Sequence, residues 1–176
     1  DIADPFTPTF TPGDFFDIVY ANCNDGFSTV NGTLLYVVNA FEGDLGLGLY
    51  DLTMTATFTD FQVSAGGETA VNNGDVTVRL NSLQFPLVSA GPSGNSLTVD
   101  GGTFTQTMTN FAGSYSQDVD AVPSPFSQSS SGTIDSTLLP GIVDYSSPVP
   151  FTGFEGEYPS AGEFLVSGEN SSARLI

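Results

Sequence analysis

The feature that most constrains the fold is a strict alternation of apolar and polar residues over residues 51–58. The apolar positions are Leu52, Met54, Ala56 and Phe58, and every residue between them is a threonine. Successive side chains of an extended strand point to opposite faces, so this segment predicts a β-strand with one apolar and one hydroxyl face. The apolar parity then changes to Phe61 and Val63, which predicts a β-bulge near Thr59–Asp60.

Glycine-containing turns between such alternating runs predict three hairpins. The Asn73–Gly74 pair tolerates positive φ and predicts a tight turn between the runs 69–71 and 76–80. Two further hairpin turns are predicted at 100–102 and 168–171. Clusters of proline, serine and glycine predict loops at 89–96, 121–131 and 146–150. Helical periodicity is absent from the sequence, so almost no helix is expected.

These patterns predict an all-β fold, either an antiparallel β-sandwich or an elongated stack of antiparallel sheets. Leu, Ile, Val and Phe make up about 28% of the chain, enough for a folded domain in spite of the high charge. We expect one domain over residues 15–176. Residues 1–14 carry Pro5, Pro8 and Pro12 among Thr and Phe, which predicts an extended arm.

The charge balance excludes several classes of function. The chain has 20 acidic and two basic residues, no His, and a formal net charge of −18. Nucleic acids and anionic membranes should repel it, because binding to either depends on Lys and Arg. Catalysis by His or Lys is excluded, so only carboxylates remain as catalytic bases. The longest apolar run, residues 34–38, is far shorter than the ~20 residues that span a bilayer, so membrane insertion is not expected.

Calcium is the first candidate ligand, since carboxylate and carbonyl oxygens coordinate it. Five aspartates on predicted turns are the candidate ligands: Asp25, Asp75, Asp100, Asp118 and Asp120. Asp is also common at turns because it hydrogen-bonds to its own backbone, and this alternative stays open at each position.

A carboxylate-dependent glycoside hydrolase is a further candidate, since such enzymes use two acids on either side of a sugar. Glu155 and Glu157 are two residues apart, beside Phe154 and Tyr158, and would share a face if extended. The alternative is a solvated, glycine-rich edge. Phe outnumbers Tyr by 15 to six and Trp is absent, which favours core filling over sugar stacking.

Three isolated residues admit more than one interpretation. Cys23 is the single cysteine; an unpaired thiol, an intermolecular disulfide and a reactive thiol are all open. Asn31 and Asn170 each begin a glycosylation triplet, which arises easily by chance in a chain rich in Ser and Thr.

The two ends of the chain suggest self-association. Phe6 and Phe10 in the arm are candidate anchors on a neighbouring copy. The final strand-like residues, Ala173, Leu175 and Ile176, would form an open edge that could pair with another chain. The alternative is that the arm folds back on its own domain.

The segment 158–175 combines Pro159–Ser160 with an alternating hairpin turned at Gly168. It resembles a recurring hairpin of uncharacterised secreted or lipid-anchored bacterial proteins. The resemblance implies an extracellular or cell-envelope setting and transfers no catalytic residue. The expected function is therefore a self-associating extracellular structural protein, forming a filament or surface assembly. The alternative is a secreted module that binds Ca²⁺, a glycan or a small apolar ligand; the glycoside hydrolase is third.

Overall fold

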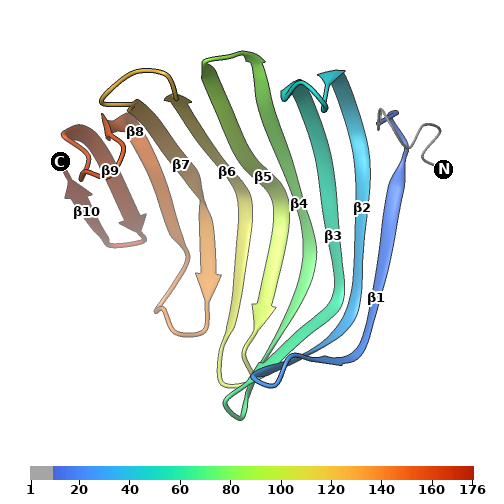
Figure 1. The fold of residues 1–176 in the computed structure, drawn as a ribbon. Coiled ribbons are helices and arrows are strands. Elements are labelled where there is room, and N and C mark those ends of the chain that lie inside the picture. The colour runs from blue at the N-terminus through green and yellow to red at the C-terminus, as the bar shows by residue number, and fades with distance from the viewer. Residues whose placement is uncertain (1–9) are drawn as a thin grey trace.

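The computed structural model describes residues 10–176, which form ten β-strands and no helix (Figure 1). The strands are β1 (Phe15–Asn24), β2 (Ser28–Asp44), β3 (Leu49–Ala65), β4 (Glu68–Gln84), β5 (Leu87–Asp100), β6 (Thr105–Asp118), β7 (Pro125–Ser136), β8 (Val143–Phe154), β9 (Ala161–Gly168) and β10 (Ser171–Leu175). Within the described residues, therefore, no helix is available to cross a membrane.

All ten strands belong to one open sheet in which every pair is antiparallel and the spatial order equals the chain order. Each strand pairs with the strands before and after it, and β1 and β10 lie at opposite edges of the sheet (Figure 1). The predicted all-β antiparallel class is confirmed. The described strands form a single layer.

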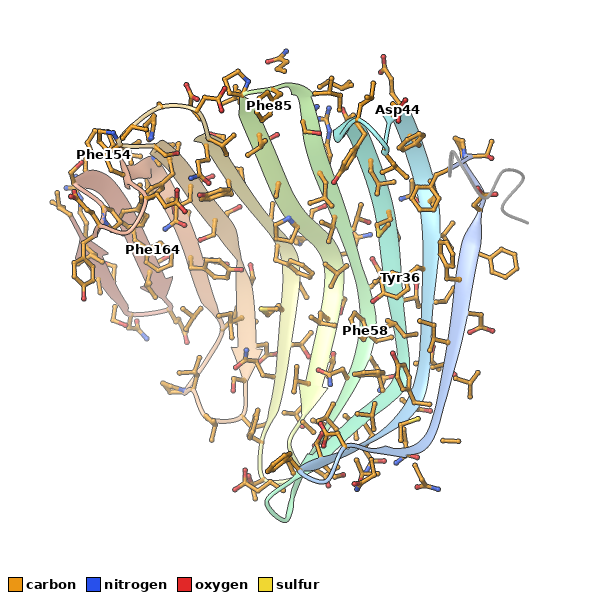
Figure 2. All side chains as sticks on the ribbon, viewed as in Figure 1. Tyr36, Asp44, Phe58, Phe85, Phe154 and Phe164 are labelled. Carbon is orange, nitrogen blue, oxygen red and sulfur yellow. The ribbon has the colours of Figure 1, made fainter. Side chains whose placement is uncertain are left out.

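The alternation seen in the sequence divides this layer into two faces. Cross-strand partners lie on the same side of a sheet, so the register assigns each strand residue to a face. We define the apolar face by its large side chains: Phe16, Ile18, Tyr20, Val30, Leu34, Tyr36, Val38, Phe41, Tyr50, Leu52, Met54, Phe58, Phe61, Val63, Val76, Val78, Leu80, Val88, Leu97, Val99, Met108, Phe111, Tyr115, Phe126, Ile134, Val143, Tyr145, Phe151, Phe164, Val166 and Leu175. The opposite side, rich in Ser and Thr, is the hydroxyl face. Figure 2 shows side chains projecting from both sides.

A line of β-bulges crosses the sheet. Asn22, Asp60 and Asn110 have φ values of 52°, 47° and 48°, and each lies at a register shift. Gly32 and Gly74 occupy the same line on β2 and β4, with φ of 101° and 126°. The bulge predicted near Thr59–Asp60 is confirmed. Each bulge changes which residues of its strand, odd or even, point to the apolar face. Because the neighbouring strands carry a bulge at the same level, their apolar residues change together, and the apolar face continues across the line.

The Asn-Gly hairpin prediction is wrong. β4 runs without interruption through Asn73–Gly74, and the chain turns instead at Gly66–Gly67. The positive φ of Gly74 serves the bulge line: a side chain there would collide with the carbonyl oxygen of Ser96 on β5. The Asn73 side chain accepts a hydrogen bond from the Asp60 N–H at 2.8 Å, which joins the bulges of β3 and β4.

The hairpins predicted near residues 100–102 and 168–171 are confirmed as the β5–β6 and β9–β10 connections. Two of the three loop predictions are wrong, since residues 89–96 lie in β5 and residues 146–150 lie in β8. The third is correct only in part, because the predicted loop 121–131 is strand from Pro125 onward. Prolines in β8 coincide with register shifts on either side of Val149, where a missing N–H interrupts little pairing.

The core is small for a chain of this length. The buried apolar side chains among the described residues are Leu34, Val38, Leu52, Ala56 and Phe111. All but Phe111 lie on β2 and β3. Towards the C-terminus, aromatic rings instead cover glycines of the adjacent strand, an arrangement that restores packing where a glycine has no side chain. The pairs are Phe111 over Gly94, Phe126 beside Gly153 and Phe151 over Gly162.

Candidate functional site

The most prominent surface of the molecule is the apolar face. It extends over all ten strands, and no second layer of the described residues covers it. Among residues 10–176, local cover comes from Phe10, which packs edge-to-face on Phe16 and Phe41 with ring centroids 6.0 and 5.8 Å apart. Val38 is 1% exposed, whereas Tyr36, Met54 and most other residues of the face remain half-buried.

Two shallow hollows mark the apolar face. The first, of about 330 Å³, is lined by Pro92, Gly113, Tyr115, Phe151 and Phe164 together with serines and Gln128. The second, of about 260 Å³, lies between β3 and β6 and includes Leu80, Val88 and Ala90. Both are open depressions in a continuous apolar surface, and the larger has aromatic rings on both sides.

The hydroxyl face is held together by polar side chains. Neighbouring hydroxyls bond across strands, as between Thr55 and Thr77 at 2.8 Å and between Ser114 and Ser129 at 2.7 Å. The register also places most charged strand residues here: Asp17, Glu42, Asp44, Asp51, Asp75, Arg79, Asp100, Asp118, Asp135, Asp144, Glu163 and Arg174. Asp60, at the bulge of β3, has no register partner. On the apolar face the register places Glu68, the first residue of β4, beside a hairpin turn.

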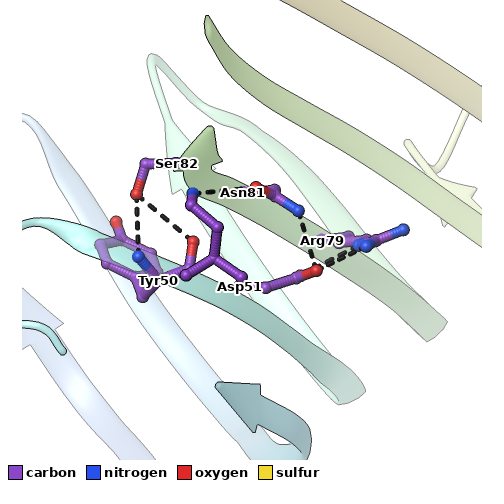
Figure 3. Close-up of polar contacts among 6 residues, drawn as sticks. Tyr50, Asp51, Arg79, Asn81 and Ser82 are labelled. Carbon is purple, nitrogen blue, oxygen red and sulfur yellow. Dashed lines mark hydrogen bonds and ion pairs between the residues drawn. The ribbon is translucent and has the colours of Figure 1, made fainter. Parts of the chain in front are cut away.

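The best-formed polar cluster surrounds Asp51 on the hydroxyl face (Figure 3). Arg79 binds this carboxylate through two nitrogens, with Nε donating to Oδ1 at 3.0 Å, and the Asn81 amide donates to Oδ2 at 2.8 Å. These hydrogen bonds, chiefly those from Arg79, hold the pKa of Asp51 below its ordinary value. The cluster fixes β3 against β4.

Glu42 on β2 and Asp51 on β3 are cross-strand partners, and both line a hollow of about 360 Å³ beside this cluster. They form a carboxylate pair that sequence reasoning missed, because nothing in the sequence indicated that 42 and 51 are partners. Glycoside hydrolysis requires one acid with a raised pKa in a desolvated setting. Glu42 is exposed and Asp51 is held ionised by Arg79, so the pair lacks that division of roles.

The candidate calcium ligands are not brought together. Asp25 and Asp100 occupy two different hairpins at one end of the sheet, whereas Asp118 and Asp120 lie at the other end and Asp75 lies within β4. No group of three acidic or thiol side chains that could hold a metal ion occurs within residues 10–176.

Three of these aspartates form turns of their own backbone. Asp25 Oδ1 accepts from the N–H groups of Phe27 and Ser28 at 2.9 and 2.7 Å, and these bonds lower the pKa of Asp25. Asp100 accepts from the Gly102 N–H at 2.8 Å. Asp118 likewise accepts from the N–H groups that follow it, at 3.2 Å. These contacts fit the turn interpretation at all three positions.

The predicted assembly residues fall in different settings. Phe6 lies outside the described residues. Phe10 contacts its own domain, as the fold-back alternative expected. Ala173 and Leu175 lie in the edge strand β10, and Leu175 and the following Ile176 are 62% and 86% exposed.

The remaining candidates are individually placed. Glu155, at the β8–β9 connection, accepts a hydrogen bond from Gln117 at 2.9 Å, and both Glu155 and Glu157 are exposed. Cys23 is a free, exposed thiol on β1. Asn31 accepts from the Asn22 N–H at 2.7 Å, which gives its side chain a role in the bulge line.

The apolar face is the surface that sequence reasoning missed, although its signal was present. The aromatic residues were expected to fill a core between layers, and they line one side of a single layer instead. Scans against protein-family models, curated proteins and solved structures each find no match to the chain.

Proposed function

We propose that this chain is a structural subunit that associates with copies of itself in an extracellular or cell-surface assembly. The observation that carries the proposal is the apolar face, which no second layer of the described residues covers, because a soluble sheet normally buries such a face against a second layer. The composition supports it, since hydroxyl residues abound and the catalytic groups His and Lys are absent. The bacterial envelope setting rests on the resemblance of residues 158–175.

Sedimentation velocity over a wide concentration range tests this proposal. We expect the weight-average mass to rise with concentration, and electron microscopy of the concentrated sample to show discrete oligomers or filaments. A strict monomer of 18.3 kDa at the highest concentration would rule the proposal out.

A binding module for a small apolar ligand or a neutral glycan is the second candidate. It is favoured by the hollow of about 330 Å³ between Tyr115 and the Phe151–Phe164 pair, a size at the low end for ligand sites. Titration with the uncharged dye Nile red and with a neutral hexasaccharide tests it. Saturable binding that Phe151→Ala weakens would support this candidate, and no binding of either probe would reject it.

Calcium binding is tested separately by thermal melting. A dispersed negative charge should be relieved equally by NaCl and CaCl₂ of the same ionic strength. A larger rise in melting temperature with CaCl₂, lost in Asp118→Asn, would support a specific site at the β6–β7 connection. Equal rises would assign the effect to screening.

A further inference from the structure

We infer that two copies bind through their apolar faces to form a two-layer β-sandwich. The inference rests on the proposed self-association and specifies its surface and its partner, a second copy of this chain. In such a pair the apolar faces lie between the layers, about 10 Å apart, and the hydroxyl faces point to solvent.

The distribution of charge is the first argument. A chain with a net charge of −18 should repel its own copies, so an interface must avoid acidic residues. The register places most charged strand residues on the hydroxyl face, and Glu68, beside a turn, on the apolar side. Asp60 lies at the β3 bulge and has no register partner, and Glu155, outside the strands, contacts Gln117 near the end of β6. In a face-to-face pair, two sheet layers separate the charged surfaces by more than the Debye length of about 8 Å at physiological salt. Salt therefore screens most of the repulsion.

The surface area is the second argument. The chain exposes 10902 Å², against about 8,100 Å² for a compact monomeric protein of its mass. At most about 1,400 Å² of this excess can come from residues 1–9, the surface of an unfolded segment of that mass. At least about 1,400 Å² per chain remains, or about 2,800 Å² for a pair, within the range of stable homodimer interfaces.

Edge-to-edge pairing does not account for the exposed surface area. It would add strands at β1 or β10 and leave the apolar face of every copy in water. β10 offers five residues, and its Arg174 is already engaged with Glu163 of β9 at 2.8 Å. β1 is longer, but a bulge between Tyr20 and Cys23 interrupts its register.

Adjacent residues of β3 provide a matched test. Met54 faces the apolar side and Thr53 the hydroxyl side, and both are half-buried. In a Cys23→Ser background, Met54→Cys and Thr53→Cys are labelled with a maleimide at increasing concentrations of the protein. At a free concentration ten times the dissociation constant, we expect labelling of Met54→Cys to slow about tenfold, while Thr53→Cys changes little. Circular dichroism confirms that both variants are folded.

Two outcomes distinguish this inference from the proposed function. If the mass rises with concentration but Met54→Cys labels as fast as Thr53→Cys, self-association stands and the face-to-face mode is overturned. If the mass never rises, the proposed function itself fails.

A variant at the sheet edge tests the alternative of edge-to-edge pairing. Val19→Lys, on the exposed strand β1, adds a charge that blocks strand addition. It should leave association intact, and loss of association in Val19→Lys would overturn the inference in favour of edge pairing.

Discussion

The strands β2–β4 and β7–β10 belong to one sheet but are stabilised differently. β2, β3 and β4 each have 17 residues, and β2 and β3 carry the buried aliphatic side chains of the described residues, Leu34, Val38, Leu52 and Ala56. β7–β10 shorten from 12 residues to five, and no apolar side chain among them is buried. In place of aliphatic packing, their apolar face has rings such as Phe126 and Phe151 beside glycines of the next strand.

The difference shows that a single-layer sheet can acquire a local core where long strands lie side by side, as β2, β3 and β4 do, although β4 itself has no buried side chain. On long strands, each apolar side chain has neighbours along its own strand and on both flanking strands, so the central ones become buried without a second layer. Short strands near an edge lack these neighbours. The first region should therefore be rigid and sensitive to truncation, and the second more tolerant.

Side-chain truncation should separate the regions most clearly. Leu52→Ala removes a side chain that is 5% exposed and should lower the free energy of unfolding by about 3 kcal/mol. Val166→Ala in β9 is half-buried and should cost about 1 kcal/mol. Urea denaturation followed by circular dichroism measures both, at one fixed protein concentration because association shifts the midpoint. Equal losses would contradict the comparison.

Glycine replacement should give the next largest difference. Gly74→Ala places a methyl group against the backbone of β5 at a φ of 126°, so overpacking and left-handed strain together should cost about 3 kcal/mol. At Gly153, a new methyl would meet the Phe126 ring at 3.1 Å, which is able to tilt, and the Cα of Pro159 at 3.2 Å. Gly153→Ala should therefore cost about 1–2 kcal/mol, less than Gly74→Ala. Thermal melts of the two variants make the comparison, and a greater loss at Gly153 would show that the second region is the more rigid.

The two ion pairs should give the smallest difference. The pKa of Asp51 is lowered in the folded state from 3.8, so its stabilisation is present above about pH 4 and is lost as the pH falls through the folded value. Arg79→Gln should lower the melting temperature at pH 7 and flatten its rise between about pH 2 and 5. Arg174→Gln, which removes a single-nitrogen contact in the second region, should have a smaller effect at pH 7. A steeper pH dependence in Arg79→Gln than in the parent chain would contradict the assignment.

The sequence predicted individual strands well because alternation is a local signal. The two faces of β3, the bulge near Thr59–Asp60 and the turns near residues 101 and 170 all depend on neighbouring residues. The Asn73–Gly74 turn failed because positive φ is needed equally by a tight turn and by a bulge, and local sequence does not separate the two. Gly66–Gly67, immediately after the alternating run, was the better turn signal.

Proline was likewise the reason for a wrong loop prediction at residues 89–96. Pro92 lies within β5, opposite Val78, although a proline in a strand is normally confined to edges and irregularities.

The number of sheet layers also could not be predicted from short stretches of the sequence. Alternation assigns a side chain to a face, but whether another sheet covers that face depends on how the strands are connected.

The candidate site, the apolar face, also depends on features that short stretches of the sequence do not contain. The residues of the apolar face share a side only through the cross-strand register, and pairs such as Leu34–Phe58 are far apart in sequence. The aspartates were recognisable as turn residues, but their separation over both ends of the sheet needed the topology. Cross-strand partnership, as between Glu42 and Asp51, is likewise a property of the assembled sheet.

The neighbour-only connectivity of the strands has a consequence for how the molecule changes in size. No strand pairing joins β1 to β10, so no closure condition fixes how many hairpins the array must contain. A two-stranded unit gained or lost at either margin would leave the remaining pairings in place, as in solenoid proteins whose modules interact only with adjacent modules. Unfolding should accordingly begin as an unzipping from the short C-terminal margin, with amide protons of β10 exchanging before those of β3.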